Sequence, residues 1–182
     1  MREEDDEKMK RSAAVFFCVM MILGLLTGAA PAAGEEEKQT LVDVISEYTS
    51  MDLGPYEGKA LFITFFTEWC PYCMQEMEHI KKIYDTYDRE ELALLLVHVW
   101  DREDASNTES VKQRFGMQDF TFFEDERMEL IRVLRVPGYP FSFFINKEGA
   151  LVNVASAMSY EEMAAAVESM GVTKASAEEA AQ

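Results

Sequence analysis

Histidine and cysteine are scarce in this chain of 182 residues, which has two histidines and three cysteines. A structural zinc ion takes about four nitrogen or sulfur ligands. Cys18 lies in an N-terminal apolar stretch, so the rest of the chain offers only Cys70, Cys73, His79 and His98. We therefore expect no metal site. We expect His79 to be a surface helix residue and His98 a packed strand residue, neither of them catalytic.

Positive charge is also in short supply. The chain has 17 Lys and Arg residues against 34 Asp and Glu residues, which gives a formal net charge of −17. A strongly acidic surface favours solubility and disfavours nucleic acid and anionic lipid as partners. We therefore expect no nucleic-acid partner, and the sequence shows no internal repeat that would indicate a repeat architecture.

An apolar stretch at residues 13–26 follows Lys10 and Arg11 and precedes an Ala-x-Ala site at Ala30 and Ala32. This layout is typical of a secretory signal peptide. Residues 13–33 are also long enough for a membrane anchor, which needs about 20 residues, so cleavage and retention both stay open. In either case we expect an exported protein, in the periplasm or on the extracytoplasmic face of the cell membrane, that touches the membrane only through residues 13–33.

The first residues of the chain fit a signal peptide less well than the apolar stretch does. Residues 3–7 are all acidic, whereas the start of a signal peptide is positively charged. We hypothesise that translation starts at Met9 rather than Met1, which N-terminal sequencing of the precursor would test. Outside the cytoplasm disulfides persist, and removal of Cys18 with the signal segment would leave Cys70 and Cys73 as the only cysteines.

The remainder of the chain divides into a linker at residues 34–38, one domain at 39–172 and a flexible tail at 173–182. The domain is long enough to bury a core, and strand-like and helix-like patterns alternate along it, which indicates an α/β fold. The pattern predicts strands at 60–66, 92–100 and 120–123, helices at 73–87, 125–134 and between Ser159 and Gly171, a short helix ending at Phe115, a hairpin of 141–145 and 150–155, and an ambiguous element at 41–45.

The most informative motif is Trp69-Cys70-Pro71-Tyr72-Cys73, between the apolar run 60–66 and a helical pattern. The two-residue spacer puts the cysteines one turn apart on the same helix, and Pro71 suits a first helical turn. Backbone N–H groups at a helix N-terminus stabilise a thiolate over a thiol. A purely structural disulfide here would close almost no loop. The motif therefore predicts a redox-active Cys70–Cys73 disulfide.

A peroxidase is a weaker interpretation of the same segment. Thr67-Glu68-Trp69-Cys70 partly matches the active-site motif of peroxiredoxins, but those proteins carry a proline four residues before the threonine. This chain has Ile63 there, which disfavours the peroxidase.

A second motif, Val136-Pro137-Gly138-Tyr139-Pro140, precedes the predicted hairpin. With the cysteine pair it resembles the thioredoxin fold, and more narrowly the exported TlpA/ResA-like thiol-disulfide oxidoreductases. The resemblance covers residues 39–172 and implies a thioredoxin-like α/β/α sandwich with a mixed central sheet. The matching features are Gly138, Pro140, the strand Phe143–Ile145, the turn Asn146–Gly149, an extra segment at 101–126 and Glu76, three residues after the second cysteine.

The resemblance also implies roles. Cys70 would attack and Cys73 resolve, and a cis-Pro140 would lie against the pair, with Pro137 as a trans turn residue. Glu76 would shuttle the proton of the resolving thiol, although from spacing alone it reads as a solvated helix residue. The predicted substrate-binding residues are Trp69, Pro71, Tyr72, Tyr139 and Pro140, and no cofactor is expected beyond the redox-active disulfide.

The direction of electron flow stays open at this point. The resemblance favours a reductase that takes electrons from a membrane thiol donor and acts on disulfides of exported proteins, as in cytochrome c maturation or cell redox homeostasis. Pro71-Tyr72 instead resembles the glutaredoxin dipeptide. The alternatives are a disulfide oxidant or isomerase and a copper-delivery protein, since thiolates suit Cu(I).

Overall fold

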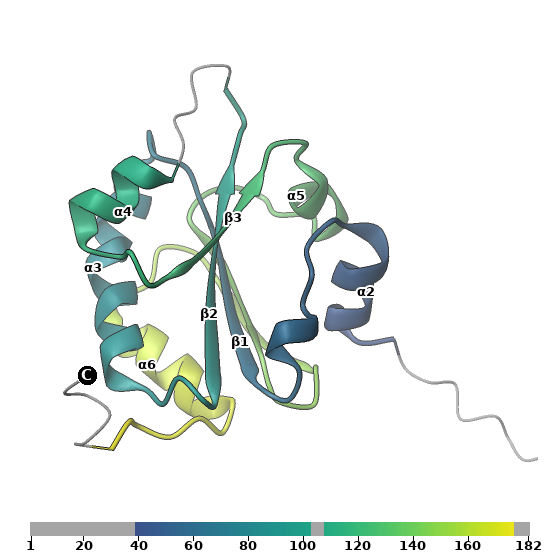
Figure 1. Ribbon diagram of the computed structural model, residues 1–182, viewed down its shortest axis with the longest axis vertical. Coiled ribbons are helices and arrows are strands. Elements are labelled where there is room, and N and C mark those ends of the chain that lie inside the picture. The colour runs from purple at the N-terminus through teal and green to yellow at the C-terminus, as the bar shows by residue number, and fades with distance from the viewer. Residues whose placement is uncertain (1–38, 103–107, 177–182) are drawn as a thin grey trace, which may run out of the picture. The chain divides into compact units, whose positions relative to one another are not determined.

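A computed structural model describes residues 39–102 and 108–176. Its centre is one sheet with the strand order β3-β2-β1-β4-β5 (Figure 1). Strands β1, β2 and β3 are parallel, and β4 and β5 run antiparallel to their neighbours. This confirms the mixed sheet expected from the sequence. The strands are β1 (Ala60–Phe66), β2 (Leu92–Val99), β3 (Thr121–Asp125), β4 (Phe141–Ile145) and β5 (Leu151–Ala155).

Helices cover both faces of the sheet (Figure 1). One face packs against α3, α4 and α6, and the other against α2 and α5. The arrangement is the predicted α/β/α sandwich. The helices are α2 (Leu41–Tyr48), α3 (Pro71–Thr86), α4 (Glu109–Phe115), α5 (Glu129–Val133) and α6 (Tyr160–Ser169), with a 3₁₀ turn η1 (Gly54–Tyr56) before β1.

Strand β1 is apolar on both sides because it lies in the middle of the sheet, between two layers of helices. All seven of its residues are buried. Phe62 and Phe66 point into the α3/α6 core, while Ile63 belongs to the core on the α2/α5 side. Phe62 also stacks on Phe144 of β4 with ring centroids 4.5 Å apart. A continuous apolar run is therefore what this strand position requires.

Two helices differ from the sequence expectation. The ambiguous residues 41–45 form α2, which begins with a capping box between Thr40 and Asp43. The predicted helix 125–134 was wrong at its start, since α5 begins only at Glu129. Asp125 instead ends β3, and its carboxylate accepts backbone N–H groups of Glu129 (2.8 Å) and Ile131 (3.2 Å). Asp125 therefore satisfies two N–H groups of the first turn of α5 from outside the helix.

The strand predicted at 120–123 is β3 at 121–125, and the helix predicted at 73–87 is α3, which already begins at Pro71. Two other boundaries agree with the sequence. The Ser159–Glu162 capping box opens α6 as predicted. Gly116 ends α4 with φ +63°, a left-handed conformation that favours glycine.

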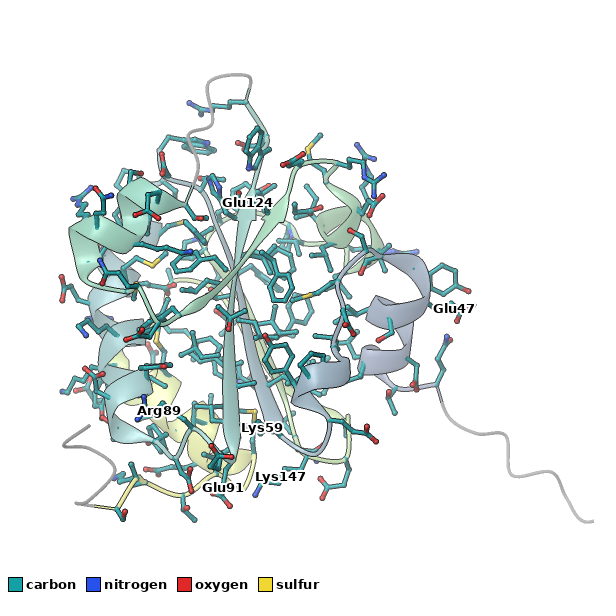
Figure 2. All side chains as sticks on the ribbon, viewed as in Figure 1. Glu47, Lys59, Arg89, Glu91, Glu124 and Lys147 are labelled. Atoms are coloured by element: carbon teal, nitrogen blue, oxygen red, sulfur yellow. The ribbon has the colours of Figure 1, made fainter. Side chains whose placement is uncertain are left out.

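The domain continues slightly beyond residue 172. The carboxylate of Glu91 accepts hydrogen bonds from the backbone N–H and the hydroxyl of Thr173. It also accepts a hydrogen bond from Lys147 Nζ at 2.7 Å. Ala175 N–H donates to the Thr86 carbonyl, so the predicted tail starts too early. Figure 2 shows Glu91 and Lys147 together near Lys59 and Arg89, at the opposite end of the strands from Glu124.

Several expectations fall on residues that the structure does not describe. The predicted signal or anchor segment 1–33, the Met9 start, the linker 34–38 and the end of the tail at 177–182 all lie outside the described residues. Within residues 39–102 and 108–176, no helix is long and apolar enough to span a membrane.

Candidate active site

Cys70 is the N-cap residue of α3, directly after the loop that leaves β1. Its extended backbone lets the Sγ atom fold back and accept the N–H of Cys73 at 3.3 Å. Pro71 occupies the first turn, as the sequence predicted. Both cysteines are free thiols; Cys70 keeps 4% of its surface exposed and Cys73 none. Cys70 is thus the more accessible sulfur.

The loop before β4 closes over this sulfur. The Tyr139–Pro140 peptide bond is cis, as predicted, and no other cis bond occurs in the described residues, so Pro137 is trans. The Cys70 thiol donates to the Tyr139 carbonyl at 3.6 Å. The Cys70 Sγ atom is therefore held between the Cys73 N–H and the backbone of the cis-proline loop.

Aromatic side chains surround Cys70 on the surface. Trp69 is 44% exposed and Tyr72 64% exposed. The Trp69 ring meets Tyr139 edge-on at 6.3 Å, and burial of Tyr139 raises its pKa to about 12. Two contacts were not foreseen from the sequence: Trp69 donates to Asp101 at 2.9 Å, and the Arg102 guanidinium lies 3.7 Å above the Trp69 ring. Only the tertiary structure brings the end of β2 to this surface.

Cys73 and Glu76 form the buried half of the site. Burial, reinforced by the hydrogen bond with Cys70, raises the pKa of Cys73 far above the usual range for a thiol. Glu76, one turn along α3, is only 4% exposed. Burial raises its pKa to about 7, although the Met158 backbone and His79 oppose the shift. Glu76 is thus a buried acid that titrates near neutral pH, and its charge bears on Cys73.

The two oxygens of Glu76 have different surroundings. Oε1 accepts the backbone N–H of Met158, from the segment between β5 and α6. Oε2 is buried and has no hydrogen-bond partner among the described residues. One oxygen is therefore anchored, and the other is available to exchange a proton.

His79 was expected to be a surface residue, and this was wrong. It is half-buried, and its Nδ1 atom bonds the Met158 carbonyl oxygen at 3.3 Å. The contact joins α3 to a segment 79 residues away in sequence. Nothing in the sequence around Met158 marks it, because Met158 contributes backbone groups rather than its side chain.

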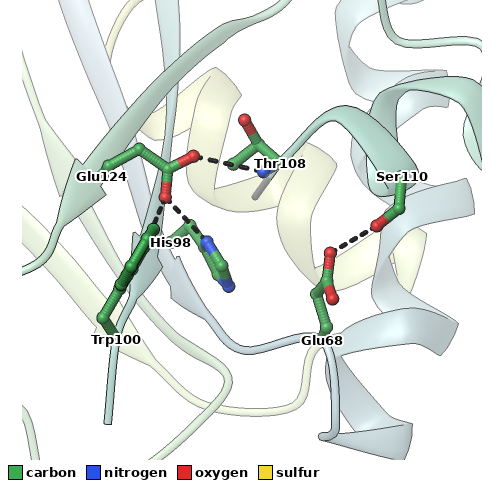
Figure 3. Close-up of polar contacts among 6 residues, drawn as sticks. All are labelled: Glu68, His98, Trp100, Thr108, Ser110 and Glu124. Carbon is green, nitrogen blue, oxygen red and sulfur yellow. Dashed lines mark hydrogen bonds and ion pairs between the residues drawn. The ribbon is translucent and has the colours of Figure 1, made fainter. Parts of the chain in front are cut away.

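His98 is a packed strand residue, as predicted. It is 1% exposed and stacks on Phe66 at 5.1 Å. Figure 3 shows the carboxylate of Glu124 bonded to His98 Nδ1 (2.8 Å), the Trp100 indole N–H (2.7 Å) and the Thr108 backbone N–H (3.2 Å). Burial tends to raise the pKa of Glu124, but these hydrogen bonds outweigh it and lower the pKa. The cluster ties the ends of β2 and β3 to the start of α4.

No group of three or more His, Cys, Asp or Glu side chains in residues 39–102 and 108–176 could hold a metal ion. The two sulfurs are instead set between a helix N-terminus, a cis-proline loop and a buried carboxyl group.

The sequence model of the AhpC/TSA family matches residues 37–154 of this chain. The chain belongs to the AhpC/TSA family. The thiol-disulfide oxidoreductase ResA of Halalkalibacterium halodurans is 27% identical over 131 residues, which is 72% of each chain. ResA of Geobacillus thermodenitrificans is 29% identical over 102 residues, or 56% of this chain and 57% of that one.

Solved structures support the thioredoxin-like architecture of this AhpC/TSA chain. A secreted disulfide oxidoreductase of Mycobacterium tuberculosis, homologous to DsbE of E. coli, superposes with a TM-score of 0.55 at 22% identity. The match covers 65% of this chain and 87% of that one. The expected thioredoxin-like fold and the likeness to ResA are therefore confirmed.

Proposed function

We propose that this protein is an exported thiol-disulfide oxidoreductase that reduces disulfides of extracytoplasmic proteins through Cys70 and Cys73, with no other cofactor. Membership of the AhpC/TSA family and the relatives named thiol-disulfide oxidoreductases support dithiol chemistry. The observation that carries the proposal is the placement of Cys70 Sγ between the Cys73 N–H and the Tyr139 carbonyl, beside exposed aromatic rings. A partner sulfur can reach Cys70 there.

In the first step, the Cys70 thiolate attacks one sulfur of a partner disulfide. The sulfur–sulfur bond of the partner breaks, a Cys70–partner mixed disulfide forms, and the other partner sulfur leaves as a thiolate. The Cys73 N–H, which already points at Cys70 Sγ, stabilises negative charge on that atom. Trp69, Pro71, Tyr72, Tyr139 and Pro140 form the surface on which we place the partner chain.

In the second step, Cys73 must lose its proton, because the thiolate is the nucleophile. Burial disfavours that ionisation. We assign the proton to Oε2 of Glu76, the buried oxygen with no partner among the described residues. Cys73 then attacks Cys70 Sγ, the Cys70–Cys73 disulfide forms, and the second partner sulfur leaves. The partner gains two electrons and this protein is oxidised.

The reductive direction follows from the resemblance to the TlpA/ResA-like oxidoreductases, which the relatives named ResA support.

The proposal extends to the source of electrons and the compartment. An oxidised Cys70–Cys73 pair needs a dithiol donor to return it to the reduced state, and we propose a membrane thiol carrier on the extracytoplasmic side. The supporting observations are the signal-like segment at residues 10–33 and the relative described as secreted. Fractionation of cells that express the full chain tests the compartment, and recovery in the cytoplasm would contradict it.

The equilibrium reduction potential of the Cys70/Cys73 couple tests the direction. Trp69 adjoins Cys70, so its fluorescence in glutathione or dithiothreitol buffers reports the redox state. We expect a potential below about −220 mV, and a value near −120 mV would mean that the protein oxidises its partners. As a control, the Cys73→Ser variant should show no redox-dependent fluorescence in dithiothreitol buffers and should accumulate a Cys70–glutathione mixed disulfide in glutathione buffers.

A further inference from the structure

The segment between β5 and α6 contacts both halves of the active site. The Ser156 hydroxyl donates to the Pro140 carbonyl at 2.7 Å. Two residues later, Met158 donates its N–H to Glu76 Oε1. Met158 is 7% exposed and packs into the core beside α3. Three consecutive residues thus connect the cis-proline loop to the buried carboxyl group.

Met158 is held at both of its backbone groups. Its N–H meets Glu76 and its carbonyl meets His79 Nδ1 at 3.3 Å, and the two side chains lie one turn apart on α3. The preceding residue, Ala157, has φ +53°, in the left-handed region that costs non-glycine residues roughly 1–2 kcal/mol. This left-handed turn at Ala157 brings the Met158 N–H towards α3. The contacts of Met158 therefore hold Ala157 in a conformation that an alanine otherwise disfavours.

We propose that residues 156–158, held in place by His79, position Glu76 for proton exchange with Cys73. The Met158 N–H fixes Oε1, and this leaves Oε2 as the oxygen that takes the Cys73 proton. His79 acts through Met158 and is a positioning residue, because its hydrogen bond is to the Met158 carbonyl. The inference rests on the proposed function, since it concerns the proton step of that reaction.

Few charged groups lie close enough to Glu76 to influence its pKa. Cys73 and His79 are its titratable neighbours on α3. The segment 156–158 contributes no ionisable side chain. On the adjoining helix α6, Glu162 is engaged in the capping box with Ser159. A change in the titration of Glu76 can therefore be traced to His79 or to the Met158 backbone.

The test is a stopped-flow reaction of the reduced protein with 5,5′-dithiobis(2-nitrobenzoate) across pH. Attack by Cys70 releases the first nitrothiobenzoate, and attack by Cys73 on the mixed disulfide releases the second. The second phase therefore reports the step that Glu76 serves, and the first phase reports the folded, accessible Cys70. We expect the wild-type second phase to rise with a midpoint near pH 7, the pKa of Glu76.

His79→Leu removes the hydrogen bond and the charge, whereas His79→Asn removes only the charge, since its amide can donate from about the position of Nδ1. A lost hydrogen bond to the charged form raises a carboxyl pKa. We expect His79→Leu to move the second-phase midpoint up by about one pH unit, and His79→Asn to restore most of it. Equal shifts in both variants, or no shift in either, would overturn the proposal.

Ala157 provides an independent pair of variants, because its side chain is exposed and only its backbone is at issue. Ala157→Gly keeps the left-handed conformation accessible and should leave the midpoint unchanged. Ala157→Val disfavours that conformation and should raise the midpoint as His79→Leu does. Gln75→Leu, at an exposed position of α3, is the matched control and should change neither phase. An unshifted Ala157→Val midpoint would contradict the role of the segment.

Glu76→Gln distinguishes the proton step at Cys73 from the positioning role of His79 and residues 156–158. If Glu76 is the base, this variant loses the midpoint near pH 7, and its second phase slows by roughly 100- to 10,000-fold. If the midpoint persists in Glu76→Gln, the proposed proton step is wrong. If it disappears but the His79 and Ala157 variants behave like wild type, only the positioning role is wrong.

Discussion

Glu76→Gln should make the reduced protein more stable at alkaline pH. The pKa of Glu76 is about 7 in the folded protein, raised by burial from 4.5. The folded state therefore holds this proton more tightly than the unfolded chain does. The contribution of Glu76 to stability is fully present below pH 4.5 and is lost as the pH rises through about 7.

The size of the effect follows from the same two values. A difference between 4.5 and about 7 corresponds to about 3 kcal/mol between the two protonation states, as an upper bound. Glutamine is neutral at every pH and can still accept the Met158 N–H through its carbonyl oxygen. We expect the free energy of unfolding of Glu76→Gln to match wild type near pH 4 and to exceed it by up to about 3 kcal/mol at pH 8.5.

Urea unfolding of the reduced proteins at pH 4, 5.5, 7 and 8.5 measures this difference. Glu78→Gln is the matched control, since it removes the same charge from an exposed position on the same helix. It should stay within about 0.5 kcal/mol of wild type at each pH. If the free energies of unfolding of wild type and Glu76→Gln run parallel from pH 4 to pH 8.5, burial does not raise the pKa of Glu76 in the folded protein.

Three further predictions concern the scaffold, and urea unfolding measures each of them. Hydrogen bonds from Lys147 and Thr173 lower the pKa of Glu91 to about 2. The stability that Glu91 contributes is therefore present above pH 4.5 and lost as the pH falls towards 2, and Glu91→Gln should flatten this acid dependence. Phe144→Ala should cost about 3–5 kcal/mol, because the fully buried ring stacks on Phe62. Gly116→Ala should cost about 1–2 kcal/mol, because φ is +63° there.

A specific result would contradict each of these three predictions. An unchanged acid dependence in Glu91→Gln would mean that its contacts to Lys147 and Thr173 do not form in solution. A cost below about 1 kcal/mol for Phe144→Ala would place that ring outside a close-packed core. A neutral Gly116→Ala would mean that α4 does not end in the left-handed conformation.

Local sequence determined the parts of this protein that depend on neighbouring residues. The apolar run of β1, the cysteine pair at the start of α3, the Ser159 capping box and the glycine that ends α4 each carry their own signal. The resemblance to exported oxidoreductases added the cis-Pro140. The start of α5 was misjudged because Asp125 ends β3 while its carboxylate accepts an N–H group of the following helix.

The tertiary structure alone decided what surrounds the cysteines. Spacing places Glu76 near Cys73, but only the tertiary structure buries it and brings it to the N–H of Met158, 82 residues away. His79 looked like a surface residue because its partner is a backbone carbonyl, and backbone groups leave no trace in the sequence. Arg102 and Asp101 reach Trp69 only because β1 and β2 lie side by side. The sequence thus determined which residues can perform the chemistry, and long-range contacts decided the environments that tune it.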